Sequence, residues 1–170
     1  QPIAKCADMA GLKIRVPDVP AYLAMPRSCG ANTTPIAFAE VYLALQNGTV
    51  EAQENPLTTI EAKKFYEVQK HIVLTGHIVD HLNTLISKSL WAQLSDADKQ
   101  IFTEVMQQAA ERSTNIIAER EPAVVATFKE RGIDVAEVDK TDFEKTVMEK
   151  AAMEDFGYVK ADWEAIRAVK

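Results

Sequence analysis

Three side chains suited to holding a small acidic molecule stand at the ends of short, strand-like segments of this sequence: Arg15, Phe38 and Asn55. An arginine can present its planar guanidinium to a carboxylate and make two charge-assisted hydrogen bonds with it. The amide of Asn55 can both donate and accept, and the ring of Phe38 can form an apolar wall. Together these residue types point to a binding site for a small molecule that carries a carboxylate group.

Each of the three residues also has an ordinary structural role, which the sequence alone leaves open. Arg15 could lie exposed at a strand end and pair with a surface acid. Asn55 precedes Pro56 and could cap the helix that begins there. Phe38 could simply belong to the hydrophobic core.

The pattern around these residues predicts alternating strands and helices. β-forming residues recur in short segments that end at proline, glycine or asparagine, as is typical of strands. The segment 71–87 is also extended in character but is interrupted by Gly76, so we expect two strand segments joined by a bend. The short strands expected from the pattern are 12–16, 34–38, 49–53 and 133–135.

Helices are expected between and after these strands. Pro26 should limit the first of them, because an internal proline removes a hydrogen bond and clashes with the preceding turn. Ser95 suits the N-cap of a long helix, which Pro122 should kink or break. The expected helices cover 21–25, 39–46, 56–69, 95–131, 142–153 and 163–169. The apolar residues expected to form the buried stripe of the long helix are Ile101, Val105, Ala109, Ile116 and Ile117.

Alternation of strands and helices with short connections predicts an α/β fold with a mostly parallel sheet. In such sheets, ligands bind beyond the carboxyl ends of the strands. That rule places the site at 15–18, 38–40 and 53–55, the segments that hold the three residues introduced above.

Composition excludes several other classes of protein. The 170 residues suffice for one ordinary domain, and the net charge is −6 with scattered Lys and Arg, which disfavours a nucleic-acid partner. No apolar run approaches the roughly 18 residues of a membrane helix. The first residues lack the apolar core of a signal peptide, so either a targeting segment has been removed or the sequence begins inside a longer protein.

Motifs of common enzyme and metal sites are missing from the sequence. It contains neither a Gly-x-Ser-x-Gly elbow nor a glycine-rich phosphate loop. His77 and His81 are four residues apart, a spacing that can hold a metal on a helix, but their segment is extended in character. We therefore expect no enzymatic chemistry, no metal and no cofactor, although an acid–base pair hidden among the carboxylates is left open.

Taken in order, several stretches resemble the substrate-binding subunits of TRAP transporters, the tripartite ATP-independent periplasmic family that includes C4-dicarboxylate and sialic-acid binders. The resemblance spans roughly residues 9–87 and is loose over the last thirty. It implies an α/β, periplasmic-binding-protein type II-like lobe with a mostly parallel sheet, a long kinked helix and C-terminal helices. The stretches that carry it are 11–17 (GLKIRVP), 30–32 (GAN), 34–42 (TPIAFAEVY), 53–56 (QENP) and 64–70 (KFYEVQK).

The resemblance implies a role for each site residue. Arg15 matches an arginine that forms a salt bridge with the ligand carboxylate, and Asn55 matches an asparagine that hydrogen-bonds it. Phe38 matches an aromatic residue that packs on the ligand, and His77 aligns with a histidine near the site in some members. Asp18 stands where sialic-acid binders resemble each other in having asparagine. An acid there suits sugar hydroxyls better than a second carboxylate.

The resemblance also implies partners and an arrangement. Members of the family are about twice this length and close two lobes over a ligand, so residues 1–80 and 121–170 would form the second lobe. Residues 81–120, a crossover strand and the long helix, would pack on a first lobe that this sequence lacks. The implied protein is periplasmic, carries a signal peptide in full length and delivers a small organic acid, either a dicarboxylate or a sugar acid, to TRAP membrane subunits. A ligand-sensing receptor lobe of related fold and an α/β enzyme are the alternatives.

The two cysteines gain meaning from this resemblance. Cys6 precedes the first strand, and Cys29 ends the helix that returns to the same edge of the sheet. The implied periplasmic location would allow a disulfide between them, whereas a reducing compartment would leave two buried thiols.

Overall fold

The computed structural model describes residues 2–151 and 159–169, which form an α/β fold. The strands are β1 Lys13–Val16, β2 Asn32–Pro35, β3 Ala52–Gln53, β4 His71–Leu74 and β5 Asp134–Glu137. The helices are α1 Pro20–Ser28, α2 Val41–Gln46, α3 Leu57–Ala62, α4 Lys88–Gln93, α5 Asp96–Glu130, α6 Lys140–Lys150 and α7 Lys160–Ala168. Short 3₁₀ turns are η1 Cys6–Met9, η2 Phe38–Glu40 and η3 Phe65–Glu67.

Every strand pair in the described chain is parallel. One sheet has the order β2-β1-β3, with Arg15 opposite Thr34 on one side and Gln53 on the other. The second sheet pairs β4 with β5. Because parallel strands need crossover connections, helices cover the sheets, and the predicted α/β class with a parallel sheet is confirmed.

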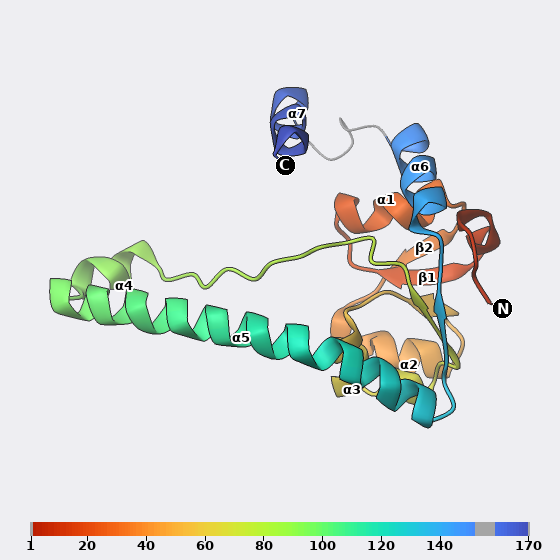
Figure 1. Cartoon of the computed structure of the whole chain (residues 1–170), viewed down its shortest axis with the longest axis horizontal. Coiled ribbons are helices and arrows are strands. Elements are labelled where there is room, and N and C mark those ends of the chain that lie inside the picture. Colours follow the sequence, from red (N-terminus) through yellow and green to blue (C-terminus); the bar gives the residue numbers. More distant parts are fainter. Residues whose placement is uncertain (1, 152–158, 170) are drawn as a thin grey trace.

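Two hydrophobic clusters form the core. In the first, α1 and α6 contact each other, and residues such as Ile14, Leu23 and Phe143 are buried together. In the second, α2, η3 and the last turns of α5 contribute Val41, Phe65 and Phe128, of which Phe128 is fully buried. The strands are therefore packed between two helical layers (Figure 1).

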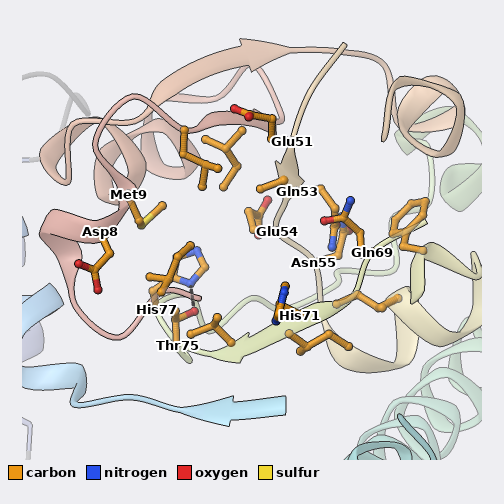
Figure 2. A pocket seen from close by; sticks show the side chains of 18 of the residues that line it. Asp8, Met9, Glu51, Gln53, Glu54, Asn55, Gln69, His71, Thr75 and His77 are labelled. Atoms are coloured by element: carbon orange, nitrogen blue, oxygen red, sulfur yellow. Dashed lines mark hydrogen bonds between the residues drawn. The ribbon is translucent and has the colours of Figure 1, made fainter. Parts of the chain in front are cut away.

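The two sheets are separate, and a cavity of about 620 Å³ lies between β3 and β4. Figure 2 shows the side chains that line it, from residues near β1 and β3 on one side to residues of β4 on the other. Asn55 and His77, which follow β3 and β4 in the chain, are among its lining residues.

Three predicted strands differ from the observed ones. The strand expected at 34–38 lies at 32–35, because its partner β1 ends at Val16, which pairs with Pro35. Phe38 consequently begins the turn η2. The strand at 49–53 is shortened to two residues, and the long extended segment 71–87 is a strand only over β4. Residues 75–87 contain no regular structure. Gly76, with a φ of 54°, redirects the chain after β4.

The observed helices differ from the predicted ones at their proline residues and at their ends. The first helix runs through Pro26 to Ser28, because a proline in the last turn disrupts only one bond while its side chain is buried. The long helix is unbroken at Pro122. The helix expected over 56–69 ends at Ala62, since Lys64 adopts a φ of 56°. Ser95 caps α5 as predicted by accepting from the Asp98 amide at 3.1 Å. Residues 152–153 of the helix expected at 142–153 lie outside the described residues.

The expected buried stripe of the long helix is exposed, which corrects the prediction. Ile101, Val105, Ile116 and Ile117 are 41–57% exposed. Figure 1 shows α4 and most of α5 extending away from the sheets, so this apolar face has no partner among the described residues. None of the helices in the described part of the chain has both the length and the apolar content to cross a membrane.

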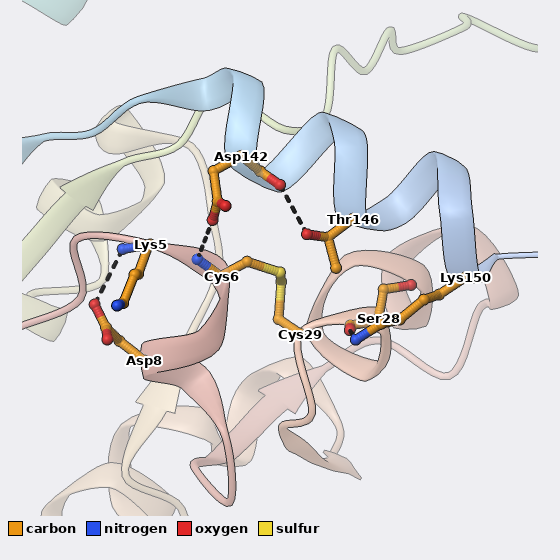
Figure 3. The surroundings of a disulfide bond; sticks show 8 residues. All are labelled: Lys5, Cys6, Asp8, Ser28, Cys29, Asp142, Thr146 and Lys150. Carbon is orange, nitrogen blue, oxygen red and sulfur yellow. Dashed lines mark hydrogen bonds between the residues drawn. A yellow bond between two sulfur atoms is a disulfide. The ribbon is translucent and has the colours of Figure 1, made fainter.

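Cys6 and Cys29 form a disulfide with Cα atoms 4.9 Å apart (Figure 3). It links η1 to the end of α1, and both residues are buried in the first cluster. Helix α6 docks on this unit: the Cys6 amide donates to Asp142 Oδ2 at 2.7 Å, and Lys150 Nζ donates to the Ser28 carbonyl at 2.9 Å. The disulfide thus anchors the segment that precedes β1.

Reduction of this disulfide should lower the thermal stability of the chain. Closing a loop with a sequence separation of 23 residues is worth about 3 kcal/mol in the chain-entropy model. A fall in Tm of roughly 6–12 °C follows for a protein of this size. Melting with and without reductant measures the effect, and a Cys6→Ala/Cys29→Ala double variant should lose all sensitivity to reductant. Two titratable thiols in the native, unreduced chain would contradict the assignment.

Candidate functional site

Arg15 is a buried cation at the carboxyl end of β1. Only 4% of its surface is exposed, and its Nε donates to the Ile36 carbonyl at 2.9 Å. Its Cζ atom lies 5.9 Å from the centre of the Phe38 ring. These contacts fix the plane of the guanidinium, while its terminal nitrogens make no hydrogen bond to a described residue. The alternative of an exposed arginine paired with a surface acid is therefore wrong.

A second charged group, the partly buried Glu54, lies near Arg15. Burial raises the pKa of Glu54, although the positive charge of Arg15 opposes this change. Burial also lowers the pKa of Arg15, and the negative charge of Glu54 opposes that shift. Among the described residues, no direct ion pair joins the two groups. The guanidinium is therefore incompletely compensated, which favours an added anion.

Asn55 follows β3 at the same edge of the sheet. Its Nδ2 donates to Gln53 Oε1 at 2.6 Å, and it lines the cavity between β3 and β4. The cap position of α3 is held by Pro56, without a side-chain hydrogen bond. Asn55 therefore does not cap this helix, and its amide remains oriented at the strand end.

Phe38 is 41% exposed, so it is not an ordinary core residue. Its ring meets that of Phe65 edge-on at 6.2 Å between centroids. Lys63 Nζ lies 5.5 Å from the Phe38 ring centre and Arg15 lies on the same ring. The ring is thus held beside the guanidinium with part of its surface open.

Tyr22 and Asp80 join this region, and the sequence analysis missed both. Tyr22 Oη donates to Asp80 Oδ2 at 2.6 Å, which links α1 to the segment after β4. This bond raises the pKa of Tyr22 to about 12 and is the largest cause that lowers the pKa of Asp80. The charge of Glu54 also contributes to the shift at Tyr22, which shows that these groups share one region. No local sequence pattern connects residues 58 positions apart.

His77 lies deeper, in the wall of the cavity (Figure 2). Its Nδ1 is 2.6 Å from Thr75 Oγ1, and its Nε2 is buried without a partner in the described chain. Burial lowers the pKa of His77, so the neutral ring is favoured. Asp18 is exposed, two residues beyond β1. The structure therefore brings together Arg15 and Phe38, and separately Asn55 and His77 in the cavity, with Asp18 at the periphery.

The described residues contain no group of three or more His, Cys, Asp or Glu side chains placed to hold a metal ion. What they do offer is a buried guanidinium, a half-open aromatic ring and polar side chains at the carboxyl ends of parallel strands. In parallel α/β sheets, small-molecule sites are commonly found at this edge.

Comparison with known proteins identifies the family. The chain belongs to the bacterial extracellular solute-binding protein family 7, whose profile matches residues 1–155. It is 43% identical over 143 residues to the sialic acid-binding periplasmic protein SiaP of Vibrio cholerae, covering 84% of this chain and 44% of that protein. It is 35% identical over 143 residues to the 2,3-diketo-L-gulonate-binding periplasmic protein YiaO of Escherichia coli, with the same coverage. The chain spans about half the length of the curated relatives it matches and corresponds to their C-terminal half.

Solved structures agree with the fold. A TRAP periplasmic solute-binding protein from a Polaromonas species bound to D-erythronate superposes with a TM-score of 0.88 at 35% identity, over 100% of this chain and 56% of that one. One from Roseobacter denitrificans with bound 3-deoxy-D-manno-oct-2-ulosonic acid gives a TM-score of 0.89 at 31% identity, over 99% and 56%. The expected family and the type II-like fold are confirmed.

The buried His77 should make the chain less stable in mild acid. In the unfolded state its pKa is about 6.5, and burial lowers it in the folded state, so acid protonates the unfolded state first. The contribution of neutral His77 to the unfolding free energy is thus fully present above about pH 6.5. It is lost as pH falls toward the lowered pKa of the folded state, by up to about 1.4 kcal/mol per pH unit.

Chemical denaturation of wild type and His77→Gln between pH 7.5 and 5 measures this effect. The variant should show a flatter dependence of the unfolding free energy on pH. His81→Gln, at an exposed histidine of the same segment, is the matched control and should keep the wild-type slope. If the unfolding free energy of wild type and of His77→Gln depends equally on pH, His77 is not the cause of the stability lost in acid.

Proposed function

We propose that this chain is the half of an extracytoplasmic solute-binding protein that binds the ligand carboxylate, and that the protein supplies a TRAP transporter with a small organic acid. The observation that supports this most strongly is Arg15, a buried guanidinium with its plane fixed and its terminal nitrogens unbound by described residues. A carboxylate is the anion whose two oxygens fit that planar fork. The protein binds its ligand without chemical change.

The remaining residues of the site fit a sugar acid better than a dicarboxylate. Phe38 offers an apolar ring face, and Asn55 offers an amide that can meet a carboxylate or a hydroxyl. Glu54, Asp80 and Asp18 are acids that accept hydrogen bonds from hydroxyl groups and repel a second carboxylate. Relatives described as bound to D-erythronate and L-galactonate support the same class of ligand.

The exposed apolar face of α5 fits a two-lobe protein. Residues 81–120 carry large apolar side chains that are open to solvent, including Leu82 at 98% and Ile101 at 57% exposure. Exposed apolar surface of this extent is typical of an interaction face. We assign it to contact with the first lobe, while residues 1–80 and 121–170 form the second lobe. The full-length protein then works in the periplasm by closing both lobes over the ligand.

Replacing Arg15 should weaken ligand binding by the full-length protein. Arg15→Lys keeps a positive charge but loses the planar pair of donors, so we expect the Kd for D-erythronate, or for the best-binding sugar acid, to rise at least about tenfold. Arg15→Ala should raise it about 100-fold or more, the loss typical for one partner of a buried charge pair. Isothermal titration calorimetry measures both.

Arg27→Lys is the matched control, because Arg27 is exposed on α1 and its Nε donates to Thr33 Oγ1 instead of facing the strand ends. Its affinity should equal that of the wild type. If Arg15→Lys binds the ligand with the same Kd as the wild type, Arg15 does not form the proposed carboxylate site.

Glu54 should discriminate against dicarboxylates. Its partly buried charge near Arg15 repels the second carboxylate of a ligand such as succinate, and like charges brought together in a binding site cost several kcal/mol. In the full-length protein, Glu54→Gln should therefore strengthen succinate binding relative to sugar-acid binding, and lower the ratio of the two affinities about tenfold. Glu51→Gln, at the opposite end of β3, should leave the ratio unchanged. A wild-type protein that already prefers succinate would overturn this account of specificity.

A further inference from the structure

Two stretches of chain join the sheets to the arm that α4 and most of α5 form. One is α5 itself, a continuous helix whose last turns are buried at Val124 and Phe128. The other is the linking segment, residues 75–87, which has no regular structure. Figure 1 shows both running from the sheets toward α4. Irregular residues absorb changes in backbone angles more readily than a continuous helix, so the linking segment is the more adaptable connection.

One hydrogen bond fastens the linking segment to the body of the fold. Tyr22 Oη, on α1, donates to Asp80 Oδ2 at 2.6 Å. No other hydrogen bond between described residues joins residues 78–86 to a helix or strand. Apolar packing adds little, because Val79 is 96% and Leu82 98% exposed. The position of this part of the segment beside α1 therefore depends mainly on the contact between Tyr22 and Asp80.

The bond between Tyr22 and Asp80 is of a strong type. Oδ2 of Asp80 accepts from Tyr22, and Oδ1 accepts from the His81 amide at 2.8 Å, so both carboxylate oxygens are held. These two bonds lower the pKa of Asp80, which is thus ionised at neutral pH. The separation of 2.6 Å lies within the range of about 2.5–2.7 Å expected for a hydroxyl that donates to a carboxylate.

The bond lies close to the proposed carboxylate site. The negative charge of Asp80 contributes to the raised pKa of Glu54, and the charge of Glu54 contributes to the raised pKa of Tyr22. Glu54 in turn lies within range of the charge of Arg15. A linking segment released from α1 would therefore lose its order next to the groups that are proposed to bind the ligand.

We propose that Tyr22 is a positioning residue for ligand binding, whose bond to Asp80 holds the linking segment against α1 before a ligand arrives. The inference rests on the proposed function, because it takes the arm to belong to a two-lobe protein that encloses a small organic acid. A segment that must be ordered during binding costs affinity, and a segment that is already held avoids that cost. Tyr22 acts through Asp80 and not by contact with the ligand.

A double-mutant cycle on ligand affinity tests this role in the full-length protein. Tyr22→Phe removes the hydroxyl group and keeps the ring, so the Kd for D-erythronate, or for the best-binding sugar acid, should rise at least about tenfold. Asp80→Ala should raise it by a similar factor, and the double variant no further than either single one. Isothermal titration calorimetry measures all four proteins. Effects that multiply in the double variant would overturn the proposal, because the two residues would then act independently.

Tyr42→Phe is the matched control. Tyr42 Oη donates to Glu67 Oε2 at 3.0 Å, which is the same kind of bond, but it joins α2 to η3 and leaves the linking segment untouched. The Kd of this variant should equal that of the wild type. Equal losses of affinity for Tyr22→Phe and Tyr42→Phe would contradict a positioning role, since they would show a general effect of losing a tyrosine hydroxyl.

Ionisation of Tyr22 in the ligand-free protein tests the bond itself. The bond to Asp80 is the largest cause that raises the pKa of Tyr22 to about 12. NMR of ¹³C-labelled tyrosine should therefore show Tyr22 still neutral at about pH 11, whereas in Asp80→Ala it should ionise closer to the ordinary pKa of about 10. Tyr42 is the internal reference, and Asp80→Ala should leave its titration unchanged. Ionisation of wild-type Tyr22 near the ordinary value would overturn the proposal.

The two readouts separate this inference from the proposed function. If Tyr22 titrates as expected but Tyr22→Phe binds the sugar acid with the wild-type Kd, the positioning role is wrong and the proposed function stands. If the wild-type protein binds no small organic acid, the proposed function falls, and the positioning role falls with it even where the titration shows the bond.

Discussion

The structure depends on one constraint, which is the burial of a guanidinium at the carboxyl end of a central parallel strand. Arg15 is almost completely buried, and a cation removed from water is costly unless polar groups compensate it. One carbonyl, that of Ile36, and one aromatic ring, that of Phe38, provide part of this compensation. Glu54 provides long-range charge compensation without a direct ion pair. The charge of Arg15 is thus compensated only in part by the described residues.

The rest of the fold serves to hold that side chain. β1 is the central strand of its sheet, so its backbone is fixed by β2 and β3 on both sides. The disulfide between Cys6 and Cys29 and the contacts of α6 anchor the chain on either side of this strand. The hydrogen bond between Tyr22 and Asp80 connects α1, which follows β1, to the segment after β4. Preorganisation of this kind reduces the ordering cost of binding.

Much of this arrangement could be predicted from the sequence, for identifiable reasons. Strand β1 and the cap of α5 at Ser95 follow from local patterns, and the parallel α/β class follows from their alternation. The Tyr22–Asp80 contact could not be predicted, because only the tertiary fold brings those residues together. The apolar stripe around Ile101 was assigned to a buried face since periodicity shows that a helix has an apolar side but not what covers it. The strands at 34–38 and 71–87 were expected too long, because the first ends where its partner β1 ends, at Val16, and the second ends before the turn at Gly76.

The most direct test of the central claim is a crystal structure of the full-length protein with a sugar acid such as D-erythronate bound. We predict that the ligand carboxylate accepts two hydrogen bonds from the terminal nitrogens of Arg15, at about 2.7–2.9 Å, while Nε keeps its bond to Ile36. A ligand whose carboxylate lies elsewhere, with Arg15 making no contact to it, would contradict the account.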